Sequence, residues 1–218
     1  MKTYKTDLLD LRCCDCMELM RDMPDKAFDL AIVDPPYGIK RGGQQETHTK
    51  NPKHKRKHHA PKEWDAGTPR REYFTELRRV SKHQIIWGAN YFVKYLTHGS
   101  MGWIVWDKGQ HGLSMSDCEL AYSSFDRATR VKTINRVELL TDGTIHPTQK
   151  PIKLYKWLLH NYAKPGDRIL DTHLGSASSA IACHYKGFHL TGAELDEDYF
   201  DAAIARVKRE TAQQELAL

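Results

Sequence analysis

Short apolar runs alternate along the chain with stretches whose apolar residues recur at helical spacing. Strand-like runs occupy about 8–14, 28–37, 84–88, 102–107, 118–125, 168–171 and 189–195. Helical patterns cover about 16–23, 69–81, a segment from about Asn90, a segment from Pro151, 178–186 and a long stretch from Asp196. Strands that alternate with helices are typical of βαβ units. We therefore predict an α/β fold with a mainly parallel twisted sheet and helices on both faces.

The pattern predicts one domain over residues 1–218. The chain has 218 residues, of which 40% are hydrophobic, so it is long enough for a full core. Neither an internal repeat nor a second domain is visible. No run of about 18 apolar residues is present, and the first residues lack the apolar core of a signal peptide. We therefore expect a soluble, cytoplasmic protein.

The net charge of +5 at pH 7 is concentrated in one segment. Residues 38–63 hold eight Lys or Arg and two Asp or Glu, a local charge of +6, which leaves −1 for the rest of the chain. The segment has few apolar residues, so it cannot form a core of its own. So concentrated a charge indicates a polyanionic partner, and a solvated basic face is the alternative.

Cysteines and histidines raise the question of a metal site. Three of the five cysteines lie within residues 13–16, and three histidines lie within 54–59 with the H-x3-H spacing of zinc fingers. No second cysteine pair accompanies them, and the histidines stand in a lysine run. We therefore expect reduced thiols, a solvated basic loop and no metal.

A candidate nucleotide site lies near the C-terminus. A strand ends at Asp171, a loop containing Gly175 follows, and a helix begins at about Ser178. In such a turn the backbone can approach a ligand closely, and helix N–H groups face it. Glu194 ends the next strand, where a carboxylate can bind both hydroxyls of a ribose. The full GxGxxG pattern is absent, so a tight turn with an incidental acid is the alternative.

A candidate catalytic site is the sequence Asp34-Pro35-Pro36-Tyr37, which ends a buried strand. A carboxylate and a main-chain carbonyl held by proline can accept both hydrogens of an exocyclic amine and orient its lone pair. A tyrosine just beyond them can stack on a base that has left its duplex. Taken alone, the tetrapeptide is equally compatible with a strand stop and a helix-capping Asp.

Three motifs in a fixed order resemble a known family. DPPY at 34–37 precedes HPTQKP at 146–151, which precedes DTHLGSAS at 171–178. In this order they are similar to the β-type, permuted amino DNA methyltransferases, which use S-adenosylmethionine, and the compact length suits a small phage or bacterial form. Residues 13–38, 85–92 and 106–109 are similar to family segments as well. The resemblance covers most of the chain except 38–63 and about 126–145, and it implies a Rossmann-like methyltransferase fold.

The resemblance also implies roles for individual residues. Asp34, Pro35, Pro36 and Tyr37 would hold the target amine and stack on the flipped base, with Asp34 also beside the cofactor. The remaining cofactor contacts would be Asp15 and Cys16 beside the adenine, His146, Thr148, Gln149 and Lys150 near the carboxylate, Asp171, His173, Gly175 and Ser176 along the methionine and ribose, and Glu194 on the ribose hydroxyls.

Two residues of the glycine loop depart from the family pattern. His173 stands where the family commonly has Phe, and we expect its charge to vary near neutral pH. Ala177 stands where Gly is common, so it needs a negative φ or accepts strain. We expect cofactor binding to be weakened mildly and to persist.

The reaction that the resemblance implies is transfer of a sulfonium methyl group to N6 of an adenine flipped out of double-stranded DNA. Asp34 favours adenine, since relatives that act on cytosine N4 more often carry Ser at this position. Cytosine N4 is the alternative target. A catalytically weak DNA-binding protein that keeps the fold is a further candidate, and so is an RNA or protein methyltransferase.

DNA contacts are expected from two basic stretches. The insertion at 38–63 directly follows Tyr37, so its charges would neutralise phosphates beside the flipped base. A short Arg-rich recognition segment at about 126–145 could read a guanine edge. The candidate DNA-binding residues are Lys40, Arg41, Lys50, Lys53, Lys55, Arg56, Lys57, Arg127, Arg130, Lys132 and Arg136. We expect a short recognition site, with a homodimer as one way to extend it; whether a restriction enzyme accompanies the protein is not visible in the sequence.

Overall fold

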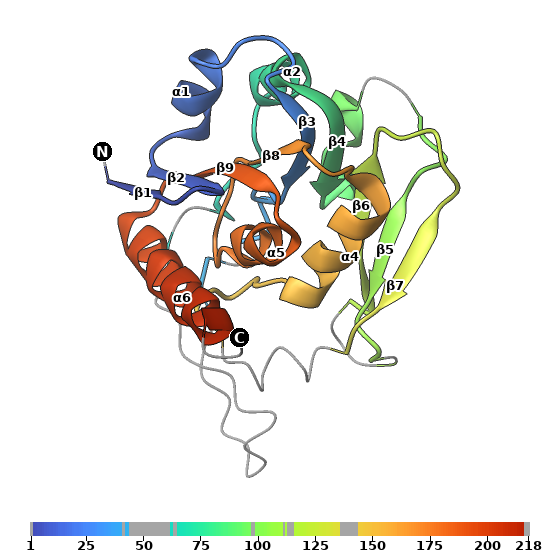
Figure 1. Ribbon diagram of the computed structural model, residues 1–218. Coiled ribbons are helices and arrows are strands. Elements are labelled where there is room, and N and C mark those ends of the chain that lie inside the picture. Colours follow the sequence, from blue (N-terminus) through green and yellow to red (C-terminus); the bar gives the residue numbers. More distant parts are fainter. Residues whose placement is uncertain are drawn as a thin grey trace.

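The computed structural model describes residues 2–40, 42–43, 62, 65–96, 99–110, 112, 116–135 and 144–215, with side chains to 212 in the last helix (Figure 1). Its strands are β1 (Thr3–Lys5), β2 (Leu9–Cys13), β3 (Phe28–Val33), β4 (Ser81–Trp87), β5 (Ile104–Asp107), β6 (Cys118–Ser123), β7 (Arg130–Thr133), β8 (Arg168–Asp171) and β9 (His189–Glu194). Its helices are α1 (Cys16–Arg21), α2 (Arg71–Val80), α4 (Ile152–Tyr162), α5 (Ser178–Lys186) and α6 (Glu197–Glu215), with 3-10 turns η3 (Ala89–Tyr91) and η4 (Val93–Tyr95).

The strands of the described residues form one nine-stranded sheet in the order β1-β2-β9-β8-β3-β4-β6-β5-β7. Strands β2, β9, β8, β3 and β4 run parallel, whereas β1 and β6 are antiparallel to their neighbours. The chain passes from β3 outward to β4 and from β8 outward to β9, so the winding reverses between β3 and β8. In open α/β sheets this reversal leaves a crevice at the carboxyl ends of the strands, where ligands bind.

Helices cover both faces of the sheet, as predicted. Helices α4, α5 and α6 pack on one face, and α1 and α2 pack on the other (Figure 1). Successive strand residues alternate between the two cores: Ile85 and Trp87 face the α4–α5–α6 side, whereas Ile86 faces α1 and α2. Because both faces are buried, the central strands are nearly continuous apolar runs. Such runs can be recognised as strands from the sequence alone.

Most predicted elements are confirmed, and the helix expected from Asn90 is not. That segment folds as the 3-10 turns η3 and η4. Asn90, Tyr91 and Val93 have modest helix propensity, and Phe92 is fully buried against the second core. The two short turns place Phe92 in the core without a continuous helix.

Two outer strands were not expected. Strand β1 pairs with β2 at one edge, and β7 pairs parallel to β5 at the other. Strand β7 lies within the Arg-rich stretch, and it carries Arg130 and Lys132 beside the exposed Val131; charged side chains of this kind help an edge strand to resist pairing with another chain. Its three-residue counterpart β1 is too short to leave a periodic signal.

The described helices include none with both the length and the apolar content needed to cross a membrane.

Candidate active site

A cavity of about 580 Å³ lies at the carboxyl ends of β2, β3, β8 and β9, at the point where the sheet winding reverses. It is also lined by the residues that lead into α2 and α4. The residues predicted from the sequence that line it are Asp15, Cys16, Asp34, Pro36, His146, Thr148, Gln149, Lys150, His173, Gly175, Ser176 and Glu194. The sheet topology therefore brings together residues that are up to 179 positions apart in the chain, as Asp15 and Glu194 are.

Glu194 and the glycine loop are joined directly. The backbone N–H of Gly175 donates to Oε2 of Glu194 at 2.8 Å, and the N–H of Asp196 donates to Oε1 at 2.9 Å. Burial raises the pKa of Glu194, whereas these two backbone donors oppose the rise. Each carboxylate oxygen keeps one further lone pair, so the pair can still accept hydrogen bonds from two hydroxyl groups in the cavity.

The glycine loop itself is held in left-handed conformations. Gly175 has φ +51°, which glycine adopts at little cost, and Ala177 has φ +58°, which strains a residue with a side chain. Of the two conformations expected for Ala177, the strained one is therefore present. The buried Arg206 of α6 donates to the carbonyl of Ser176 at 2.7 Å and to Oγ of Ser178 at 2.9 Å, which fixes this turn. Sequence reasoning missed Arg206, because a basic residue in a long polar helix has no distinguishing pattern.

Asp171 is buried at the end of β8 and does not itself line the cavity, whereas Thr172 and His173 beside it do, so its predicted contact with a cofactor stays a prediction. Its Oδ2 accepts from Oγ of Ser179 at 2.5 Å and its Oδ1 accepts from the N–H of His173 at 3.1 Å. Both oxygens are therefore used to hold the loop. Burial, with the nearby Asp34 and Glu194, raises the pKa of Asp171 to about 7.

His173 is a neutral, hydrogen-bonded ring. Burial lowers the pKa of His173 to about 4, so the expectation that its charge varies near neutral pH is wrong. Its Nδ1 lies 2.9 Å from Oγ1 of Thr172, which lies 2.7 Å from the hydroxyl of Tyr73. The His173 and Tyr73 rings also meet edge to face, with centroids 5.3 Å apart. Tyr73, on α2, is a cavity residue that the sequence did not indicate.

The catalytic candidate Asp34 sits in a polar cluster that is partly buried. The Tyr37 hydroxyl donates to Oδ1 of Asp34 at 2.5 Å, and the Lys150 ammonium pairs with Oδ2. Lys150 is buried, and its Nζ also lies 3.2 Å from Oε2 of Glu119. Burial raises the pKa of Asp34, and the Lys150 charge opposes that rise. Lys150 thus lies against the catalytic candidate in this structure, while its predicted role near a cofactor carboxylate stays a prediction.

Tyr37 does not line the cavity; its ring belongs to an aromatic group beside it. The ring stacks on Tyr91 with centroids 5.1 Å apart and an interplanar angle of 12°, and it meets Phe92 edge-on. Gly88 lies so close that a Cβ there would be 2.0 Å from the Tyr37 ring. Only glycine fits at this position. Pro35 is buried, and Pro36 lines the cavity.

The remaining predicted cofactor residues also line the cavity. The His146 ring contacts Tyr199 with centroids 4.5 Å apart, and its Nδ1 lies 3.1 Å from Oγ1 of Thr148. Asp15 caps α1 by accepting from the N–H of Met17 at 2.6 Å. Burial raises the pKa of the Cys16 thiol to about 12, so it is protonated at pH 7. Among the described residues, no group of three or more metal-ligating side chains comes together.

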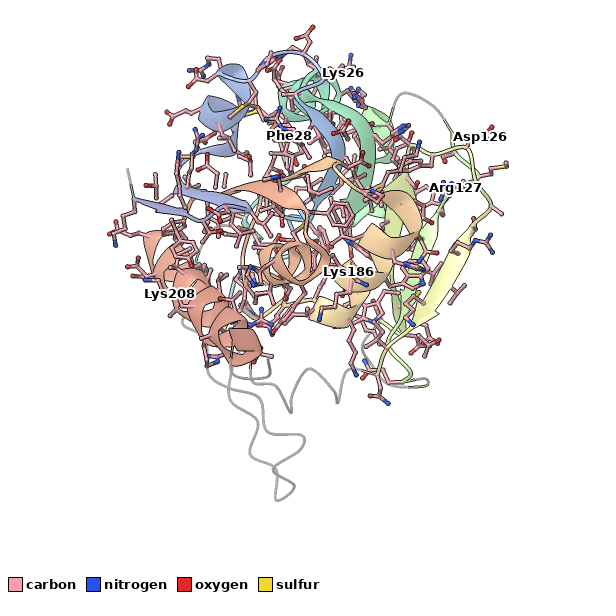
Figure 2. The ribbon with its side chains drawn as sticks, in the orientation of Figure 1. Lys26, Phe28, Asp126, Arg127, Lys186 and Lys208 are labelled. Carbon is pink, nitrogen blue, oxygen red and sulfur yellow. The ribbon has the colours of Figure 1, made fainter. Side chains whose placement is uncertain are left out.

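The predicted DNA-binding residues are only partly described. Lys40 is exposed, and Arg130 and Lys132 lie on β7. Arg127 lies in the segment between β6 and β7 (Figure 2). Its Nη1 donates to the carbonyl of Asn161 at 2.5 Å, and its guanidinium lies over the rings of Phe125 and Tyr162. Arg41, Lys50, Lys53, Lys55, Arg56, Lys57 and Arg136, and the histidines at 54, 58 and 59, lie outside the described residues.

The described ends of the basic insertion are tied to the cavity. The N–H of Lys62 donates to the carbonyl of Gly42 at 3.0 Å, and the Lys62 ammonium pairs with Asp196 at 2.6 Å and with Asp198 at 2.9 Å. Asp196 in turn donates its N–H to Glu194. The insertion thus begins and ends beside the residues that form the cavity.

Comparison with known proteins adds evidence independent of this geometry. A family model described as DNA methylase (N6_N4_Mtase) matches residues 47–205. The Type II methyltransferase M.HinfI of Haemophilus influenzae is 22% identical over 244 residues, covering 89% of this chain and 67% of that protein. Two solved structures are similar in fold. M1.HpyAVI in complex with SAM has a TM-score of 0.60 at 17% identity and covers 91% of this chain and 100% of that chain. The cytosine-N4-specific PvuII DNA methyltransferase has a TM-score of 0.63 at 12% identity and covers 96% and 92%.

Proposed function

The chain belongs to the N6_N4_Mtase family of DNA methylases, and from that membership we propose that it transfers a methyl group from S-adenosyl-L-methionine to N6 of an adenine in double-stranded DNA. The order of its motifs, DPPY before HPTQKP before the glycine loop, supports the permuted, β-type subgroup. The observation that carries the proposal is that Asp34 and Glu194 line one cavity from the two sides of the switch point.

The cavity suits a nucleoside-containing methyl donor. Its volume lies within the roughly 300–1,000 Å³ of small-molecule sites. Glu194 would hold the ribose hydroxyls, and Gly175 lets the backbone approach the ligand because it carries no side chain. Asp15, Cys16 and Leu195 would surround the base at the β2–β9 end. When bound, the donor supplies a methyl group on a sulfonium, which is already activated for transfer.

Asp34 is placed to act on the acceptor. Its carboxylate can accept a hydrogen from the exocyclic amine and so orient the nitrogen lone pair toward the methyl group. The N–C bond forms as the S–C bond breaks, and the amine then loses one proton to Asp34 or to water. The target base must leave the duplex, because its amine is paired there.

The aromatic group beside Asp34 supports a planar acceptor. Tyr37 and Tyr91 present stacked rings next to the cavity, and Tyr91 is exposed. Stacking of this kind holds an extruded base. A carboxylate rather than a hydroxyl in the first motif position favours adenine N6 over cytosine N4.

The experiment is methyl transfer to unmethylated double-stranded DNA, followed by mass spectrometry of the nucleosides. We expect N6-methyladenine from the wild-type protein. Asp34→Asn should lower the transfer rate at least about 100-fold while leaving donor binding within about two-fold. Asp22→Asn, which changes an exposed carboxylate directly after α1, is the matched control and should be fully active.

Each competing function gives a different product. N4-methylcytosine would overturn the adenine assignment while leaving the family role intact. DNA binding without any methyl transfer would favour a non-catalytic DNA-binding protein. Methylation of RNA or peptide in place of DNA would reject the substrate class.

A further inference from the structure

A row of alternating charges leads away from Asp34 through the protein. Lys150 lies between Asp34 and Glu119, with its Nζ 3.2 Å from Oε2 of Glu119, and Nζ of Lys108 lies 2.9 Å from Oε1 of Glu119. The four residues come from different segments: the end of β3, the turn before α4, strand β6 and the residue after β5. Two acids and two bases make the row neutral.

Lys150 depends on both of its carboxylates. Its side chain is 2% exposed, and an ammonium that deeply buried is costly unless paired. The ring centroids of Trp87 and Tyr37 lie 5.3 and 5.7 Å from its Nζ, which adds weaker stabilisation. Burial lowers the pKa of Lys150, but Asp34 and Glu119 outweigh it and raise that pKa above its ordinary value. Lys150 therefore stays charged.

This pairing obstructs the proposed reaction unless it can be relaxed. Oδ2 of Asp34 faces the Lys150 ammonium, and Oδ1 accepts from Tyr37. A lysine held by Asp34 alone would occupy the carboxylate that the target amine must reach. Glu119 gives the same ammonium a second carboxylate to pair with, so Lys150 can release Asp34 and still be paired with a negative charge.

We propose that Glu119 is a positioning residue that shares Lys150 with Asp34, so that Asp34 can accept the hydrogen of the target amine, and that Lys108 sets how strongly Glu119 competes. This inference rests on the proposed function, since it assigns the rest of the charged row to the same acceptor site. The sequence assigned no role to either residue, although Lys108 lies within the family-like segment 106–109.

The proposal predicts opposite effects from its two outer members. The titratable groups around Asp34 are Lys150, Glu119, Tyr37, Tyr73, Tyr155 and Asp171. When Glu119 loses its charge, the Lys150 ammonium pairs with Asp34 only, and the stronger pairing lowers the pKa of Asp34. When Lys108 is removed, Glu119 has Lys150 as its only partner in the row and attracts that ammonium more strongly. The ammonium then pairs less closely with Asp34, and the pKa of Asp34 rises.

The test is the pH dependence of single-turnover methyl transfer by Glu119→Gln and Lys108→Gln. For Glu119→Gln we expect a rate about ten-fold or more below wild type at pH 7.5. We also expect the acid limb of the pH–rate profile, where the rate falls as Asp34 is protonated, to move to lower pH by about one unit. For Lys108→Gln we expect the acid limb displaced upward, and for Glu119→Asp a partial rescue of the rate. Donor affinity, measured by calorimetry, should stay within about two-fold of wild type in each case.

The outcomes separate this inference from the proposed function. A wild-type protein that transfers no methyl group contradicts the proposed function itself. An active wild type whose two variants keep its acid limb, or shift it in the same direction, overturns the role of Glu119. Loosened packing alone would lower activity in both variants without opposite displacements. If Glu119→Gln fails to fold, the direction of the Lys108→Gln shift still decides.

Discussion

At the scale of single residues, burial sets the chemistry of the site. The same loss of water raises the pKa of Asp171 to about 7, lowers that of His173 to about 4 and keeps Cys16 a thiol. Asp171 and His173 are each also held by a hydrogen bond to a neighbouring hydroxyl group, from Ser179 and Thr172 respectively. The ionisable groups at this end of the sheet are therefore held by specific hydrogen bonds as well as shifted by burial.

Ala177 permits a test of backbone strain in the glycine loop. Its φ of +58° costs about 1–2 kcal/mol, and glycine would relieve that cost while losing a buried methyl worth about 0.8 kcal/mol. Ala177→Gly should therefore leave the free energy of unfolding within about 1 kcal/mol of wild type, measured by urea denaturation. Ala180→Gly, in the interior of α5 and equally buried, should cost about 2 kcal/mol. Equal losses in the two variants would show that Ala177 is not strained.

At the scale of elements, the segment after β6 contains two exposed arginines in different settings, Arg127 and Arg130. Arg127 binds the end of α4 through the carbonyl of Asn161 and covers Phe125 and Tyr162. Arg130 and Lys132 project from the edge strand β7, two residues apart and hence on one face. The Arg-rich stretch is thus not a uniform DNA-reading surface.

This division predicts different phenotypes for two neighbouring arginines. Arg127→Gln should lower the free energy of unfolding by about 1–2 kcal/mol, because it removes a carbonyl hydrogen bond and two cation–π contacts. Arg130→Gln should stay within about 0.5 kcal/mol of wild type. Urea denaturation measures both, and a titration of labelled duplex DNA provides the second readout. An Arg127→Gln protein of unchanged stability but weaker DNA binding would reverse the assignment.

At the scale of the whole molecule, the charge is divided between a near-neutral core and a basic insertion anchored beside the cavity. The anchors are the Gly42–Lys62 hydrogen bond and the Lys62–Asp196 ion pair. Asp196 and Asp198 partner Lys62, so at least one cation of the insertion serves the fold. We assign the remaining cations of the insertion to DNA phosphates.

Deleting residues 44–60 tests that assignment while retaining both anchors. The deletion removes five Lys or Arg, so the slope of log Kd against log salt should become shallower by about four. Lys5→Gln, an exposed lysine at the β1 edge, is the control and should leave the slope unchanged. Fluorescence anisotropy with duplex DNA at several salt concentrations measures it. A deletion variant with the wild-type slope would show that DNA is held elsewhere.

The sequence by itself determined the alternating elements, both covered faces of the sheet and the motifs of the cavity. These are local properties, because apolar runs, proline stops and short motifs such as 34–37 or 171–178 can be read within a few residues. The tertiary structure decided which groups face one another. In the folded protein, the Asp171 carboxylate accepts from the N–H of His173, and the Lys150 ammonium pairs with Asp34 and Glu119. Burial lowers the pKa of His173 so that its ring is neutral, and Arg127 donates to a carbonyl of α4. Such pairings join residues up to 116 positions apart, and the charge of a buried group depends on all its neighbours, so no local pattern contains them.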